Sequence, residues 1–77
     1  MVTDERVVQA AVAAAESVVF SRYDRSDLRD IDVAVTFEDG VLDVDVYIDA
    51  PDAGDAGTVA DEAALAARDA VDDLLEG

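Results

Sequence analysis

The dipeptide Asp39-Gly40 most constrains the fold, because apolar and polar residues alternate strictly on both sides of it. Asp-Gly strongly favours the two-residue type I′ turn, in which both central residues take positive φ angles. The stretch from Arg29 to Ile48 therefore predicts an antiparallel β-hairpin.

Counting outward from the turn predicts the register of the two strands. If Glu38 lies opposite Val41, every second cross-strand pair is apolar on both strands. These apolar pairs are Phe37 with Leu42, Val35 with Val44, Val33 with Val46, and Ile31 with Ile48. The opposite face carries Asp30, Asp32, Ala34, Thr36, Glu38, Val41, Asp43, Asp45, Tyr47 and Asp49. A shift by one residue would mix the two faces, so the pattern specifies the register.

The residues before the hairpin predict an amphipathic helix that ends near Phe20. Thr3 can cap its N-terminus, and Asp4 and Glu5 lie in the first turn, where the helix dipole favours negative charge. Its apolar side consists of Val7, Val8, Ala11, Val12, Ala14, Ala15, Val18 and Val19. Phe20 falls outside this side, and we expect its ring to turn inward where the helix ends.

A second helix is predicted after a loop over residues 50–57, which is rich in Gly, Asp and Pro. Thr58 and Asp61 have the spacing of a capping box, and the pattern runs to about Leu75. The apolar side consists of Val59, Ala60, Ala63, Ala64, Ala67, Ala70, Val71, Leu74 and Leu75. Leu65 falls near the middle of the acidic side, so it is a candidate partner contact.

These elements predict one α+β domain over residues 1–77, with the order α-β-β-α and both helices on the apolar face of the hairpin. Of the apolar residues, 15 are Ala and 13 are Val, so the core is light. A two-stranded sheet is marginal in water and leaves both edges unpaired. We therefore expect a homodimer, or a heterodimer with a related small subunit, that extends the sheet.

The charge of the chain predicts its surroundings. It has no Lys and no His, and its net charge is -15. At molar salt the Debye length falls to about 3 Å, which screens most of the resulting repulsion. The composition therefore indicates a cytoplasmic protein of a salt-accumulating halophile. The sequence shows neither a long apolar run nor a charged and then apolar leader. We therefore expect no membrane-spanning segment and no secretion.

The order of these elements resembles that of a small archaeal, haloarchaeal family of unknown function. It also resembles, more distantly, the dimerising small subunit of the KEOPS complex, which installs threonylcarbamoyl on transfer-RNA adenosine. The similarity involves the strand residues 30–33, the turn residues 38–40 and the helix start at residues 57–59. It implies a dimer formed through the sheet and a role as an accessory or dimerisation subunit, or as a paralogue of one, since that subunit's first strand has no counterpart here.

The residue types argue against an enzyme. Without Cys, His or Lys, no base is placed to activate a hydroxyl nucleophile. Asp43 and Asp45 share a strand face, but a flat face offers no cleft to raise one pKa. The acidic loop at residues 49–55 departs from EF-hand spacing, so weak cation binding is the interpretation left open there. We expect no catalytic residues, no cofactor and no specific metal site.

Three of the five cations, Arg22, Arg25 and Arg29, gather around Tyr23. One interpretation is that they neutralise neighbouring aspartates and the carbonyl groups at the end of the first helix. The alternative is an RNA-binding module that uses this cluster, although the acidic chain makes direct nucleic-acid binding a minor expectation. The leading hypothesis is a nonenzymatic protein–protein interaction module, with Leu65 and the arginine cluster as candidate contacts.

Overall fold

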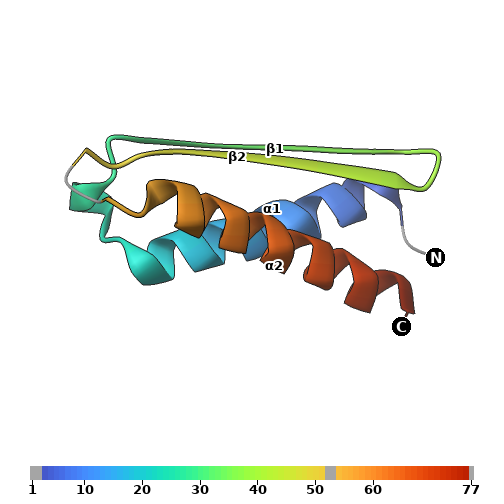
Figure 1. Ribbon diagram of the computed structural model, residues 1–77. Helices are drawn as coiled ribbons and strands as arrows, with labels where there is room; N and C mark the ends of the chain where they lie inside the picture. The colour runs from blue at the N-terminus through green and yellow to red at the C-terminus, as the bar shows by residue number, and fades with distance from the viewer. Residues whose placement is uncertain (1–2, 52–53, 77) are drawn as a thin grey trace.

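The computed structural model describes residues 3–51 and 54–76, which form two layers (Figure 1). The elements are α1 (Asp4–Arg22), the short 3-10 helix η1 (Arg25–Asp27), β1 (Asp30–Glu38), β2 (Val41–Asp49) and α2 (Ala56–Glu76). The hairpin forms one layer, and the two helices form the other. The predicted α+β fold with the order α-β-β-α is confirmed.

The hairpin has the predicted register along its whole length. Glu38 lies opposite Val41, and the antiparallel pairing continues without interruption to Asp30 and Asp49. Asp39 and Gly40 have φ angles of 52° and 78°, as a type I′ turn requires. The Asp-Gly turn and the alternation of apolar and polar residues therefore specify the same hairpin register.

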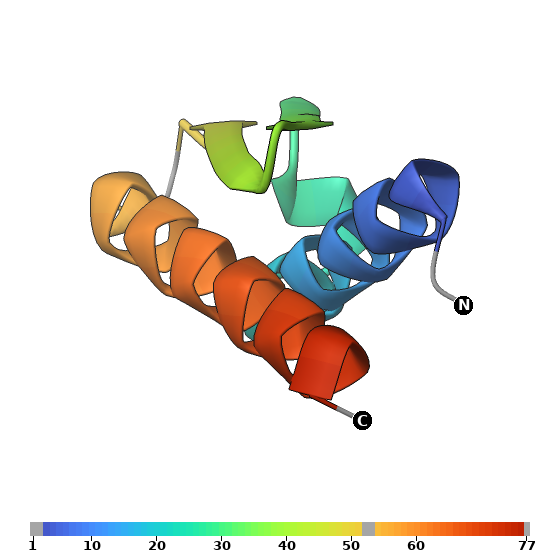
Figure 2. The same cartoon turned by 90° about the vertical axis from the view of Figure 1, so that its right-hand side faces the viewer.

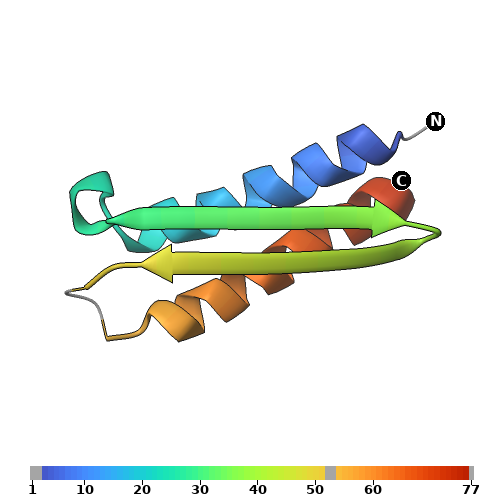
Figure 3. The ribbon, with the colours of Figure 1, turned by 90° about the horizontal axis from the view of Figure 1, so that it is seen from above.

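The two helices run antiparallel and cross beneath the hairpin (Figures 2 and 3). Both contribute the same sequence of buried side chains, Val-Ala-Ala-Val, at intervals of four residues. These residues are Val7, Ala11, Ala15 and Val19 in α1, and Val59, Ala63, Ala67 and Val71 in α2. Each is at most 2% exposed. The alanines at the centre of each row allow the two helix backbones to approach closely.

The helices cover the apolar face of the hairpin only in part. Of the eight side chains on this face, Ile48 alone is buried. The other seven are half-buried: Ile31, Val33, Val35, Phe37, Leu42, Val44 and Val46. The fold thus leaves apolar strand surface accessible, and within the described residues β1 and β2 pair only with each other.

The first helix is slightly longer than predicted. Thr3 caps it as expected, since its Oγ1 accepts a hydrogen bond from the Arg6 N–H at 3.1 Å. The helix ends at Arg22 rather than near Phe20, because Tyr23 takes an extended conformation while its N–H still donates to the Val19 carbonyl at 3.0 Å. The prediction that Phe20 turns inward was wrong, since this ring is 37% exposed.

The predicted start of the second helix was wrong. α2 begins at Ala56, so Thr58 lies inside its first turn and forms no capping box with Asp61. The Val59 N–H donates to the Asp55 carbonyl at 3.0 Å, so the first hydrogen-bonded turn starts at Asp55, three residues before Thr58. At the other end, Leu75 is 53% exposed rather than part of the core.

Neither of the helices in the described ranges is both long and apolar enough to cross a membrane.

Candidate interaction surfaces

The arginine cluster predicted around Tyr23 does not form one cationic surface. Arg22, at the end of α1, forms an ion pair with Glu62 of α2, with an Nη2–Oε2 distance of 2.6 Å. Arg22 therefore links the two helices, rather than neutralising the neighbouring aspartates. Both side chains are solvent-accessible, so the contribution of this pair to stability is modest.

Tyr23 is buried at the same end of the molecule. Its hydroxyl donates a hydrogen bond to Asp55 Oδ1 at 2.7 Å. The hydrogen bond to Asp55 raises the pKa of Tyr23, and desolvation and the negative charge of Asp55 act in the same direction, whereas the charge of Arg22 lowers it. Because Asp55 directly precedes α2, this bond connects the end of one helix to the start of the other.

Tyr23→Phe is expected to lower the melting temperature at neutral pH, because it removes the hydroxyl that joins the helix ends and keeps the ring. The raised pKa means that the folded protein holds the phenol proton more tightly than the unfolded chain does. This contribution is complete below the ordinary pKa of 10.0 and is lost as the pH rises through the raised value. Melting followed by circular dichroism should show the difference between the two proteins closing above pH 10.0.

The control for this measurement is Tyr47→Phe. Tyr47 is 58% exposed on the outer face of the hairpin, so its substitution should leave the melting temperature unchanged. Equal melting temperatures of Tyr23→Phe and the unmodified protein at neutral pH would mean that the hydroxyl contributes nothing to stability.

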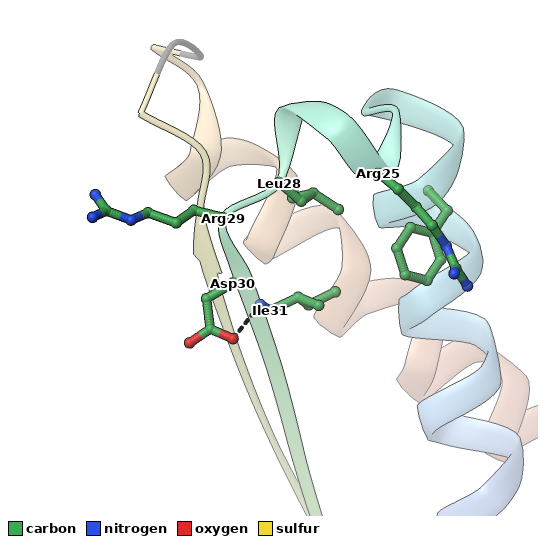
Figure 4. A pocket seen from close by; sticks show the side chains of 6 residues that line it. Arg25, Leu28, Arg29, Asp30 and Ile31 are labelled. Atoms are coloured by element: carbon green, nitrogen blue, oxygen red, sulfur yellow. Dashed lines mark hydrogen bonds between the residues drawn. The ribbon is translucent and has the colours of Figure 1, made fainter.

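Arg25 and Arg29 are directed to different sides of β1 (Figure 4). The Arg25 guanidinium carbon lies 5.5 Å from the centroid of the Phe20 ring, in cation–π geometry. In Figure 4, Leu28 and Ile31 extend on the side of Arg25, whereas Arg29 extends on the opposite side. A hollow of about 300 Å³ beside the start of β1 is lined by three apolar and three charged residues: Phe20, Leu28, Ile31, Arg25, Arg29 and Asp30.

Backbone hydrogen bonds fix the chain at the start of β1. The Arg29 N–H donates to the Asp49 carbonyl at 2.8 Å, which closes the open end of the hairpin. The Ile31 N–H donates to Asp30 Oδ1 at 2.9 Å. Arg29 thus has a structural role through its backbone, and its side chain remains exposed.

Leu65 lies on the surface, where the helical pattern predicted it. It is 62% exposed on α2. Together with Val44, Asp61, Ala64 and Arg68, it lines a groove of about 340 Å³ between the helix and the strand. The structure therefore places Leu65 beside half-buried apolar surface, next to the unpaired edge of β2.

The acidic side chains form no metal centre within residues 3–51 and 54–76. No group of three or more Asp or Glu side chains there converges in a way that could hold an ion. The loop at residues 49–55, for which weak cation binding was an open interpretation, includes residues 52 and 53, which lie outside the described residues.

A comparison with known proteins gives a relative from the haloarchaeon Natronomonas pharaonis. The two sequences are 53% identical over 74 residues, which span 96% of this chain and 89% of the relative. The chain belongs to the same family as this archaeal protein. The relative is described as an uncharacterized protein. No protein-family model matches the chain, and no solved structure matches it significantly.

Proposed function

We propose that the protein is a nonenzymatic interaction module of the halophile cytoplasm, and that it dimerises by pairing the β1 edges of two copies. The half-burial of seven of the eight apolar-face side chains of the hairpin carries this proposal. A four-stranded sheet would cover more of this surface and would pair the free backbone groups. The residues along each edge indicate which of the two edges is used.

The free backbone groups belong to the apolar-face residues. In a two-residue hairpin, Glu38 and Val41 exchange hydrogen bonds across the turn, and hydrogen-bonded pairs then alternate with non-hydrogen-bonded pairs. Val33 and Val35 therefore direct N–H and C=O groups outward from β1. By the same alternation, Val44 and Val46 direct theirs outward from β2. Both edges could in principle accept another strand.

Charge favours the edge of β1. Two copies of β1 can pair antiparallel in the register that places Ala34 of one copy opposite Ala34 of the other. In this register, Asp32 of one copy lies opposite Thr36 of the other. Only the end pairs, Asp30 with Glu38, bring two acids together. Like charges directly opposite one another destabilise a strand pair, so this register keeps the unfavourable contacts at the solvent-exposed ends.

The edge of β2 has no equivalent register. In the register that centres on Val44 of both copies, Asp43 of one copy lies opposite Asp45 of the other. In the register that centres on Asp45, the two copies of Asp45 lie opposite each other. Pairing about Val46 places Asp43 opposite Asp49. Each central register thus opposes two aspartates, and self-association through β2 is disfavoured.

The side of α1 nearest β1 adds apolar surface to the proposed interface. Val8 and Val12 are half-buried and lie four residues apart, so they share one side of the helix. Phe20 lies eight residues after Val12 in the same helix. Together with Ile31, it lines the hollow beside β1. Two copies joined at β1 would bring these side chains of the two α1 helices toward each other.

Single-cysteine variants test the proposed edge, because the chain contains no cysteine. Ala34→Cys should form an intermolecular disulfide quantitatively under mild oxidation in about 2 M KCl, since a central non-hydrogen-bonded pair places the Cα atoms about 4.5 Å apart. Asp45→Cys is the control, because Asp45 is the cross-strand partner of Ala34. It should cross-link slowly, although the substitution removes a repulsive charge. Equal cross-linking of both variants, or of Asp45→Cys alone, would contradict dimerisation through β1.

The resemblance to the dimerising KEOPS subunit names a candidate for the larger assembly. We propose that the dimer, or a heterodimer with a related small subunit, acts as a KEOPS-type accessory or dimerisation subunit in transfer-RNA modification. The order of helices and strands supports this proposal. Gel filtration of the protein with a haloarchaeal KEOPS catalytic subunit at high salt tests it. Separate elution of the two proteins, with the dimer intact, would count against the KEOPS role alone.

A further inference from the structure

The edge of β2 combines three features that the proposed dimer leaves unused. Its outward backbone groups pair with no other strand in the described structure. The groove next to it is lined by apolar side chains, including the exposed Leu65. The outer face of the strand is acidic at Asp43, Asp45 and Asp49.

We propose that this edge, termed the β2 groove (β2 with Asp61, Ala64, Leu65 and Arg68), binds an extended segment of another protein in which apolar residues alternate with Lys or Arg. This inference rests on the proposed function, since it names the partner of the interaction module. The segment pairs with β2 as an added strand, which is an established mode of peptide recognition.

The inner side of the added strand determines the need for apolar residues. Side chains of successive strand residues point to opposite faces, so every second residue of the segment would face the helices. There it would contact Val44 and Leu65, which line the groove of about 340 Å³. Leu65 is 62% exposed in the free chain, and covering it removes apolar surface from water.

The outer side of the added strand determines the need for positive charge. Asp43 and Asp45 are exposed, and their cross-strand partners on β1 are the uncharged Thr36 and Ala34. Within the described residues, neither carboxylate has a cation paired with it. Opposite charges across neighbouring strands stabilise their pairing, so Lys or Arg at these positions of the segment fits this edge.

The same two carboxylates exclude other occupants. A second copy of β2 would place aspartates against aspartates, as described above. An acidic segment, or the phosphate backbone of a nucleic acid, would also place negative charge against these two carboxylates. The β2 groove therefore discriminates by charge on its outer face and by apolar contact on its inner face.

A labelled peptide tests the proposal directly. The peptide has nine residues, the length of β2, and alternates Arg with Val or Leu. Its binding to the protein is measured by fluorescence anisotropy in about 1 M KCl, where a Debye length of about 3 Å suppresses long-range attraction to the acidic chain. A peptide of the same composition, with the arginines grouped at one end, serves as the control. We expect the alternating peptide to bind at least about tenfold more tightly.

Protein variants assign the binding to this edge. Leu65→Asp and the double variant Asp43→Asn/Asp45→Asn should each weaken the alternating peptide by about tenfold. Their matched controls are Ala13→Asp, at an exposed position of α1, and Asp32→Asn/Glu38→Gln, which removes two charges from the outer face of β1. Both controls should bind like the unmodified protein. Equal binding of the two peptides, or equal losses in variants and controls, would overturn the proposal in favour of nonspecific charge attraction.

The oligomeric state of the same samples separates this inference from the proposed dimer. If peptide binding fails while sedimentation still shows a dimer, the β2 groove is wrong and the proposed function stands. If Ala34→Cys fails to cross-link, the dimer through β1 is wrong, whatever the peptide does. Circular dichroism of each variant confirms that it is folded before its binding is interpreted.

Discussion

Ala15→Leu should destabilise the protein by about 1–3 kcal/mol, or prevent it from folding. Ala15 is fully buried in α1, in the row of side chains that packs against α2. A leucine adds three carbon atoms where two helix backbones approach closely, so the helices must move apart or the side chain must adopt a strained rotamer. Chemical denaturation at high salt, followed by circular dichroism, measures the free energy of unfolding.

Ala13→Leu is the control for this substitution. Ala13 lies two residues away on the exposed side of the same helix, so the same change should alter stability by no more than about 0.5 kcal/mol. If Ala15→Leu is tolerated as well as Ala13→Leu, the helices are not in close contact through their alanines, and the described packing of α1 on α2 would be incorrect.

Transfer from about 3 M to 0.1 M KCl should dissociate the proposed dimer and reduce helix content, because the Debye length grows to about 10 Å at the lower concentration. The chain carries a net charge of -15. Asp30 and Asp49 lie directly opposite each other in the hairpin. With charges unscreened, this repulsion opposes a core made largely of Val and Ala, and folded proteins have a small stability margin. Sedimentation and far-ultraviolet circular dichroism across the salt range measure both effects.

A charge-reduced variant shows whether repulsion is the cause. Asp43→Asn/Asp45→Asn removes two negative charges from the outer face and should shift the folding transition to lower salt. A compact monomer with unchanged helicity at about 0.1 M KCl would contradict the prediction, and it would also remove the argument that a second copy completes the sheet. An unchanged transition in the variant would assign the salt effect to hydration of the core instead.

The sequence predicts the hairpin in full because two independent signals agree. The alternation assigns each side chain to a face, and Asp39-Gly40 places the turn at one position only. The start of α2 could not be predicted in the same way, since Asp55 and Thr58 are both favoured cap residues. The choice depends on a contact between distant parts of the chain, in which the Tyr23 hydroxyl holds the Asp55 side chain.

The sequence predicts the exposure of Leu65 but not the directions of the arginine side chains. Leu65 departs from the helical pattern, so the sequence alone placed it on the surface. The arginines are close in sequence, but η1 and the extended chain after it send their side chains in different directions, which composition does not reveal. The outer face of β1 is uncharged at Ala34 and Thr36, whereas that of β2 is acidic at Asp43 and Asp45. This contrast affects strand pairing because, in the described residues, each strand has one edge without a partner strand.

The identical Val-Ala-Ala-Val rows of α1 and α2 have a consequence for how the chain selects its own helix pairing. The two rows present the same side chains in the same order, so these buried rows alone do not distinguish α1–α2 from α1–α1 contact. The distinction comes from the contacts at one end, Arg22 with Glu62 and Tyr23 with Asp55, which only the α1–α2 arrangement satisfies. Loss of these contacts would allow helices to exchange between copies.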